Sequence, residues 1–145
     1  MATVNVYLTF NGNTEEAFNF YKSVFGGDFT YLGRFKDMPA DENCPPPSED
    51  EGNRIMHVSL AISKETILMG SDSTSFSGDV TFGNNFSVSI NTNSKEEADK
   101  LFNGLSANGT IIMPMEKTFW GAYFGMFTDK FGINWMVNFD EVPAS

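Results

Sequence analysis

The feature that most constrains the fold of this chain is a pattern of strand and helix signals that occurs twice. Residues 3–10 alternate with a period of two and are followed by a stretch with apolar residues at helical spacing. Residues 85–91 alternate in the same way and precede a second stretch with a similar apolar stripe. The residues expected to cap the two helices, Asn13 and Ser94, are 81 positions apart, and several helix residues recur at that offset. Such a repeat predicts a duplicated module.

Each copy is predicted to hold one strand, one helix and three further strands. Glu16 and Glu97 stand three residues after the expected caps, which is the spacing of a capping box. The expected strands cover residues 3–10, 29–35, 55–62 and 66–70 in the first copy, and residues 85–91, 110–113, 122–128 and 134–139 in the second. The predicted fold class is therefore α+β, with two tandem βαβββ modules, about 1–72 and 84–141, in a single domain, 1–145.

Two segments lack both periodicities. Residues 37–53 are acidic and contain three consecutive prolines, so this segment is predicted to be a mobile loop or an arm that lies on a partner. Residues 71–84 are rich in Ser, Asp and Gly and are predicted to form a second loop.

The alternation within the strands also assigns side chains to the two faces of each sheet. The side chains expected to meet the helices are Met56, Val58, Leu60 and Ile62 in one strand and Phe86, Val88 and Ile90 in another. The side chains expected on the opposite faces are His57, Ser59 and Ala61, and Asn85, Ser87 and Ser89. Small polar residues in two related strands predict the lining of a cleft, and the alternative is that both faces are simply solvated.

Composition narrows the possible partners. The chain has 145 residues and a formal charge of −10, so it does not readily supply the basic patch that a nucleic acid requires. No apolar run is long enough to span a membrane, and the first ten residues lack the basic start of a signal peptide. The single cysteine, Cys44, excludes an intramolecular disulfide and a cysteine-based zinc cluster. We therefore expect a cytoplasmic protein that binds neither nucleic acid nor membrane.

Few residues suggest chemistry. His57 is the only histidine and could act as a general base, but no carboxylate at a diagnostic spacing would orient it, so a structural role is the alternative. Trp120 and Tyr123 lie close to Gly121 in the sequence and could form a wall over a ligand, or else a core or dimer contact. Asp129 is expected to shape a turn by accepting hydrogen bonds from nearby backbone amides. Glu116 is either a base or an exposed surface acid.

Several stretches together resemble a known superfamily. They are 7–12, 20–21 with 25–27, 56–57, 68–72, 118–125 (TFWGAYFG) and 128–135 (TDKFGINW). The chain resembles the vicinal oxygen chelate superfamily, which has the fold of glyoxalase I, bleomycin-resistance proteins and extradiol dioxygenases. It is most similar to the PhnB-like branch, often labelled 3-demethylubiquinone-9 3-methyltransferase. The resemblance implies curved sheets around a shared cleft and a homodimer.

The resemblance also implies one divalent metal held by His, Gln or Glu side chains from four strands. In this sequence the four positions fall on Val6, on or next to Met69, on Asn85 or Phe86, and on Met136. None of these is a good ligand for a hard divalent ion, so no metal site and no cofactor are expected. Methyl transfer is not supported either, because residues 11–16 are acidic and contain one glycine where the common methyltransferase fold needs a glycine-rich loop.

The first functional hypothesis is a metal-free protein that binds a small molecule in an apolar and aromatic cleft. The expected lining residues are Val6, His57, Ser59, Met69, Asn85, Trp120, Tyr123 and Met136. The second is a metal-dependent lyase, isomerase or dioxygenase of the same superfamily with relocated ligands, such as His57 with Glu116 or Asp72. The third is a protein with a collapsed cleft that serves only in interactions. No catalytic residue is assigned.

Overall fold

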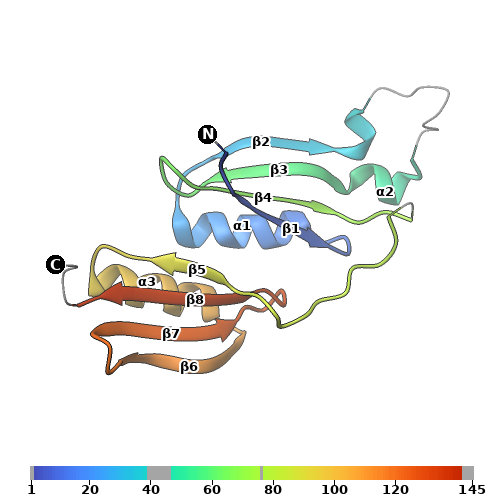
Figure 1. Ribbon diagram of the computed structural model, residues 1–145. Coiled ribbons are helices and arrows are strands. Elements are labelled where there is room, and N and C mark those ends of the chain that lie inside the picture. Colours follow the sequence, from blue (N-terminus) through green and yellow to red (C-terminus); the bar gives the residue numbers. More distant parts are fainter. Residues whose placement is uncertain (1, 39–46, 76, 142–145) are drawn as a thin grey trace. The chain divides into compact units, whose positions relative to one another are not determined.

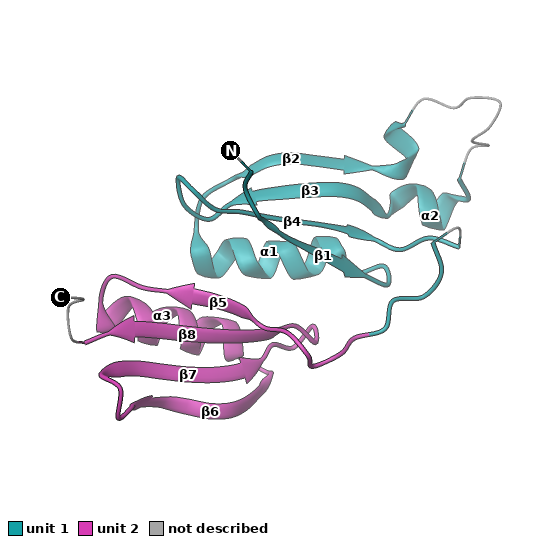
Figure 2. Ribbon diagram, viewed as in Figure 1, with its two compact units in different colours: residues 1–81 teal, residues 82–145 magenta. Residues whose placement is uncertain are grey.

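The computed structural model describes residues 2–38, 47–75 and 77–141, and it divides into two compact units, Met1–Thr81 and Phe82–Ser145 (Figure 2). Cys44 and most of the proline run expected in a mobile arm lie outside the described residues. Within the described ranges, no helix has the length and apolar character needed to cross a membrane.

The first unit holds one four-stranded sheet with a long helix on one face (Figure 1). Its elements are β1 (Val6–Phe10), α1 (Thr14–Phe25), β2 (Phe29–Arg34), the short 3-10 helix η1 (Phe35–Asp37), α2 (Glu49–Asn53), β3 (Ile55–Ala61) and β4 (Ile67–Asp72). The strand order is β1-β4-β3-β2, with β1 parallel to β4 and the other pairs antiparallel.

The second unit repeats this plan. Its elements are β5 (Val88–Asn91), α3 (Lys95–Ser106), β6 (Thr110–Lys117), β7 (Ala122–Thr128) and β8 (Asn134–Asp140). The order β5-β8-β7-β6, with β5 parallel to β8, matches the first sheet strand for strand. The predicted α+β class with two βαβββ modules is therefore confirmed.

The core of the first unit forms where α1 packs on β3 and β4. Phe18 and Tyr21 of α1 are fully buried, as are Val58 and Leu60 of β3. A side chain at Gly70 of β4 would meet the Phe18 ring at 2.7 Å, so only glycine lets the helix approach this closely. Burial of each large apolar side chain stabilises the fold by about 2–3 kcal/mol, so this helix contact contributes several kcal/mol to the stability of the unit.

The core of the second unit forms in the same way, where α3 packs on β7 and β8, but it uses different aromatic residues. Trp135 and Val137 of β8 and Phe127 of β7 are buried on the side of α3. Phe102 of α3 contacts Phe127 edge to face, with ring centroids 5.1 Å apart. Gly125 of β7 lies beneath Phe102, because a side chain there would meet that ring at 2.8 Å. The odd-numbered residues of β7 therefore face the helix.

Three local predictions are wrong. Residues 49–53 form the short helix α2 instead of a loop, and the side chain of Ser48 accepts a hydrogen bond at its start. Ile55 occupies the buried position expected for Met56, because the register of β2 and β3 leaves Met56 as the extra residue of a bulge. Phe86 is 62% exposed and precedes β5, so it does not pack on the second helix.

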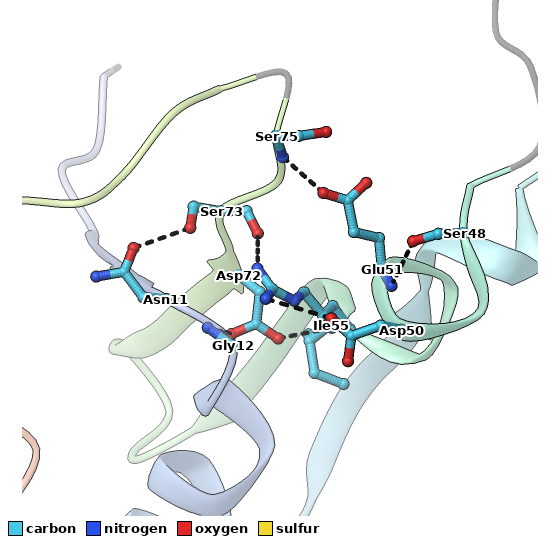
Figure 3. A network of polar contacts seen from close by, with 10 residues as sticks. Asn11, Gly12, Ser48, Asp50, Glu51, Ile55, Asp72, Ser73 and Ser75 are labelled. Atoms are coloured by element: carbon cyan, nitrogen blue, oxygen red, sulfur yellow. Dashed lines mark hydrogen bonds and ion pairs between the residues drawn. The ribbon is translucent and has the colours of Figure 1, made fainter.

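The start of α1 also differs from the prediction. The side chain of Asn13 makes no capping hydrogen bond. Instead, Asp72 at the end of β4 reaches the helix start, where its Oδ1 accepts from the backbone nitrogens of Gly12 and Thr14 and from the Thr14 hydroxyl. Its Oδ2 accepts from the backbone nitrogen of Ile55 in β3 (Figure 3). One buried carboxylate thus joins β4, α1 and β3, at the end of the helix where the dipole favours a negative charge.

The start of α3 is closer to expectation. Ser94 accepts a hydrogen bond from the backbone nitrogen of Glu97, as a capping residue does. The Glu97 carboxylate accepts from the backbone nitrogen of Asn93, one residue before the cap. The two related helices are therefore capped by different means, one locally and one from a distant strand.

The predicted turn at Asp129 is confirmed. Its Oδ1 accepts from the backbone nitrogens of Phe131 and Ile133, and its Oδ2 accepts from the indole nitrogen of Trp135 at 2.8 Å. Because Asp129 and Trp135 are both buried, this carboxylate fixes the turn before β8 to the core of the second unit.

Candidate functional site

The first sheet carries a row of side chains on the face opposite α1. The strand register pairs Tyr7 with Met69, Met69 with Ser59, and Ser59 with Tyr31, so the row crosses all four strands. His57 lies two residues before Ser59 on β3 and shares its face. These five residues are called the first open face.

His57 is the centre of the first open face. Its Nδ1 lies 3.2 Å from the hydroxyl oxygen of Tyr7, and its Nε2 lies 3.0 Å from the hydroxyl oxygen of Ser59. The rings of Tyr7 and Tyr31 flank the imidazole, with centroid distances of 5.6 and 5.8 Å. Since a hydroxyl can donate or accept, this arrangement accommodates either neutral tautomer of His57.

The first open face combines apolar area with a few polar groups. Tyr7 is 47% exposed and Tyr31 is 49% exposed, whereas Ser59 is buried beneath them. Exposed aromatic rings around a half-buried hydrogen-bonding group form the kind of surface that orients a small ligand.

The second sheet has an equivalent row. Ser89 pairs with Met136, Met136 with Met126, and Met126 with Met113. Met136 occupies the position in β8 that Met69 occupies in β4. This second row offers thioethers where the first offers hydroxyls and aromatic rings, and methionine suits an adaptable apolar surface.

The structure therefore brings together three of the expected lining residues and places a fourth in the other unit. His57, Ser59 and Met69 share the first open face, and Met136 lies on the equivalent face of the second sheet. Tyr7 and Tyr31 were missed. The alternation of β1 could have revealed Tyr7, because its neighbours Leu8 and Phe10 alternate into the core.

Four expected residues lie elsewhere. Val6 pairs with buried Leu68, so it belongs to the helix side of the sheet, one residue from Tyr7. Asn85 is exposed and precedes β5. Trp120 is 59% exposed in the turn before β7, where it contacts Phe119 and Phe124.

Tyr123 lies on the helix side of the second sheet. Its hydroxyl donates to Oδ1 of Asp99 in α3 at 2.6 Å, and the ammonium of Lys95 lies 4.7 Å from its ring centroid. The hydrogen bond to Asp99, followed by burial and the negative charges of Asp99 and Glu141, raises the pKa of Tyr123 to about 12. Tyr123 therefore joins α3 to β7 and does not belong to an open face.

A spectroscopic titration checks this assignment of Tyr123. The raised pKa means that folding favours the neutral phenol, so this contribution to stability is complete below the ordinary tyrosine pKa of about 10 and is lost as the pH rises through about 12. We expect the phenolate absorbance of the protein to show one late step, absent in Tyr123→Phe and moved to lower pH in Asp99→Asn. Identical titration curves for the three proteins would contradict the assignment.

The donor groups on the first open face differ from those of a divalent metal centre. They comprise one imidazole, hydroxyls and a thioether, whereas hard divalent ions prefer several carboxylates or imidazoles. In the described ranges, no group of three or more His, Cys, Asp or Glu side chains could hold an ion. The suggested pairing of His57 with Asp72 is wrong, because Asp72 is buried and both its oxygens accept hydrogen bonds from the start of α1 and from Ile55.

The duplicated sheet plan is that of a known fold class. A glyoxylase/bleomycin resistance protein/dioxygenase domain from Frankia sp. EAN1pec superposes with a TM-score of 0.67, covering 97% of this chain and 98% of that one. At 12% identity this likeness concerns the fold alone. It agrees with the resemblance to the vicinal oxygen chelate superfamily.

The family within that class follows from the sequence. The family model described as 3-demethylubiquinone-9 3-methyltransferase matches residues 2–138, and the chain belongs to this family. It is 34% identical over 141 residues to protein YjdN of Escherichia coli K12, covering 91% of each chain. It is 38% identical to protein PA1353 from Pseudomonas aeruginosa, whose crystal structure matches with a TM-score of 0.84 over 97% of this chain and 98% of that one. The resemblance to the PhnB-like branch is confirmed.

Proposed function

We propose that this protein binds a small molecule on the first open face and does so without the metal ion of its superfamily. The observation that carries the proposal is the row Tyr7, Met69, Ser59 and Tyr31, with His57 beside it. The two tyrosine rings supply flat apolar contacts, and the polar groups between them give a ligand its orientation.

The division of roles follows from burial. Ser59 is buried and His57 half-buried, so both are held in place by the sheet, while the tyrosine rings are exposed enough to be covered by a ligand. Met69 lies between Tyr7 and Ser59 in the row, where its flexible side chain can adapt to the shape of the ligand. We infer binding as the function and assign no reaction, because no described strand residue of this face offers a carboxylate to accompany His57 in proton transfer.

Benzyl alcohol is a suitable neutral probe of this proposal. We expect it to shift the NMR signals of the His57 ring and the Met69 methyl group. Tyr7→Ala should weaken this binding several-fold, because removal of an aromatic contact typically costs about 1 kcal/mol. Tyr123→Phe provides the control, since it alters a tyrosine that lies on the helix side of the second sheet and not on an open face.

The metal-free part of the proposal is tested in the same titration. The affinity for benzyl alcohol should be equal in EDTA and in excess Zn²⁺. Binding that disappears in EDTA and returns with Zn²⁺ would refute the proposal and would support a metal-dependent activity with relocated ligands. Probe-induced shifts confined to residues remote from Tyr7 and His57 would refute the location of the site.

A further inference from the structure

We infer that the ligand of the first open face is an anionic aromatic molecule, with His57 as its cationic partner. This inference rests on the proposed function and adds the chemical class of the ligand. It is drawn from the groups that surround the His57 ring.

Each ring nitrogen of His57 lies beside a hydroxyl oxygen, which can accept a hydrogen bond from that nitrogen when it carries a proton. The hydroxyl oxygen of Tyr7 lies beside Nδ1, and that of Ser59 lies beside Nε2. If the ring carries two protons, each N–H therefore has an acceptor ready within the sheet. The arrangement accommodates the imidazolium without requiring any side chain to move.

The described strands of the first sheet place no carboxylate beside the positive charge of that imidazolium. The titratable groups that face His57 are Tyr7 from β1 and Tyr31 from β2. The other residues that share this side of the four strands are uncharged: Thr9, Gly33, Ser59, Ala61, Ile67, Met69 and Ser71. Among the described strand residues of this face there is thus no carboxylate, and the charge is available to a ligand.

The two tyrosine rings add the requirement for a flat ligand. They are tilted by 32° and 44° to the imidazole and are about half exposed, so an aromatic ring can lie against them. Tyrosine rings alone would also attract a cation. A positive His57 at the centre of this face selects against a cation, and salt screens the formal charge of −10 on the whole chain beyond roughly 8 Å at physiological ionic strength.

Three probes of similar shape separate the possibilities: benzoate, neutral benzamide and cationic benzylamine. We expect the full-length protein to bind benzoate about fivefold or more tightly than benzamide. His57→Gln should remove this preference while benzamide still binds, and Tyr123→Phe should behave as the unmodified protein.

The outcomes distinguish this inference from the proposed function. Equal affinity of the unmodified protein for benzoate and benzamide would overturn the inference of an anionic ligand and leave binding on the first open face intact. Tighter binding of benzylamine than of benzoate would do the same. If none of the probes shifts the signals of Tyr7 and His57, both proposals fail. Circular dichroism checks the fold of His57→Gln, and the order of affinity for the three probes on the unmodified protein decides the question if that variant does not fold.

Discussion

Asp72→Ala should lower the free energy of unfolding by about 3–4 kcal/mol, because it leaves several buried donors without an acceptor. Asp72 accepts hydrogen bonds from Gly12, from the amide and hydroxyl of Thr14, and from Ile55. Asp72→Asn should be nearly as harmful, since donors surround both oxygens and an amide supplies only one oxygen. Urea denaturation followed by circular dichroism measures both effects.

Two matched controls sharpen the Asp72 experiment. Asn13→Ala should change stability by less than about 0.5 kcal/mol, because Asn13 holds the capping position without a capping bond. Ser94→Ala should cost about 1 kcal/mol, as expected for a local cap. A large loss in Asn13→Ala together with a small one in Asp72→Ala would mean that α1 is capped locally after all.

The second large effect is expected at Asp129. Asp129→Ala should cost about 3 kcal/mol, because the buried indole N–H of Trp135 and two turn amides lose their acceptor. Trp135→Phe is the informative companion, since it removes the indole donor together with its need for a partner. If Asp129 acts as described, the double variant should be more stable than the sum of the two single losses predicts. If the loss of unfolding free energy in the double variant equalled the sum of the losses in Asp129→Ala and Trp135→Phe, the two side chains would not be coupled and the description would be contradicted.

The sequence patterns predicted those parts of the fold that depend on residues close together in the chain. The alternation of β-strand residues placed Val58 and Leu60 in the core and His57 on the opposite face. The Asp129 turn was predicted for the same reason, because its backbone partners lie within four residues. The repeat predicted two modules with the same succession of strands and helix, and the strand order within each sheet came only from the structure.

Interactions between distant segments account for what the sequence did not reveal. The carboxylate that caps α1 comes from a residue 58 positions further along the chain, so no spacing rule near Asn13 indicates it. The bulge at Met56 arises from pairing with β2 and shifts one buried position along β3. The position of the superfamily's first metal ligand falls on Val6, which was therefore expected to line the cleft. In the structure, the pleat of β1 turns the neighbouring residue, Tyr7, toward His57 instead.

Metal analysis of the purified protein tests the central claim most directly. The protein should be purified without chelator, and its content of Zn, Mn, Fe, Ni and Cu measured by inductively coupled plasma mass spectrometry. The account predicts substoichiometric metal and an unfolding midpoint that EDTA does not change. One tightly bound ion per chain, lost together with thermal stability in His57→Ala, would contradict it.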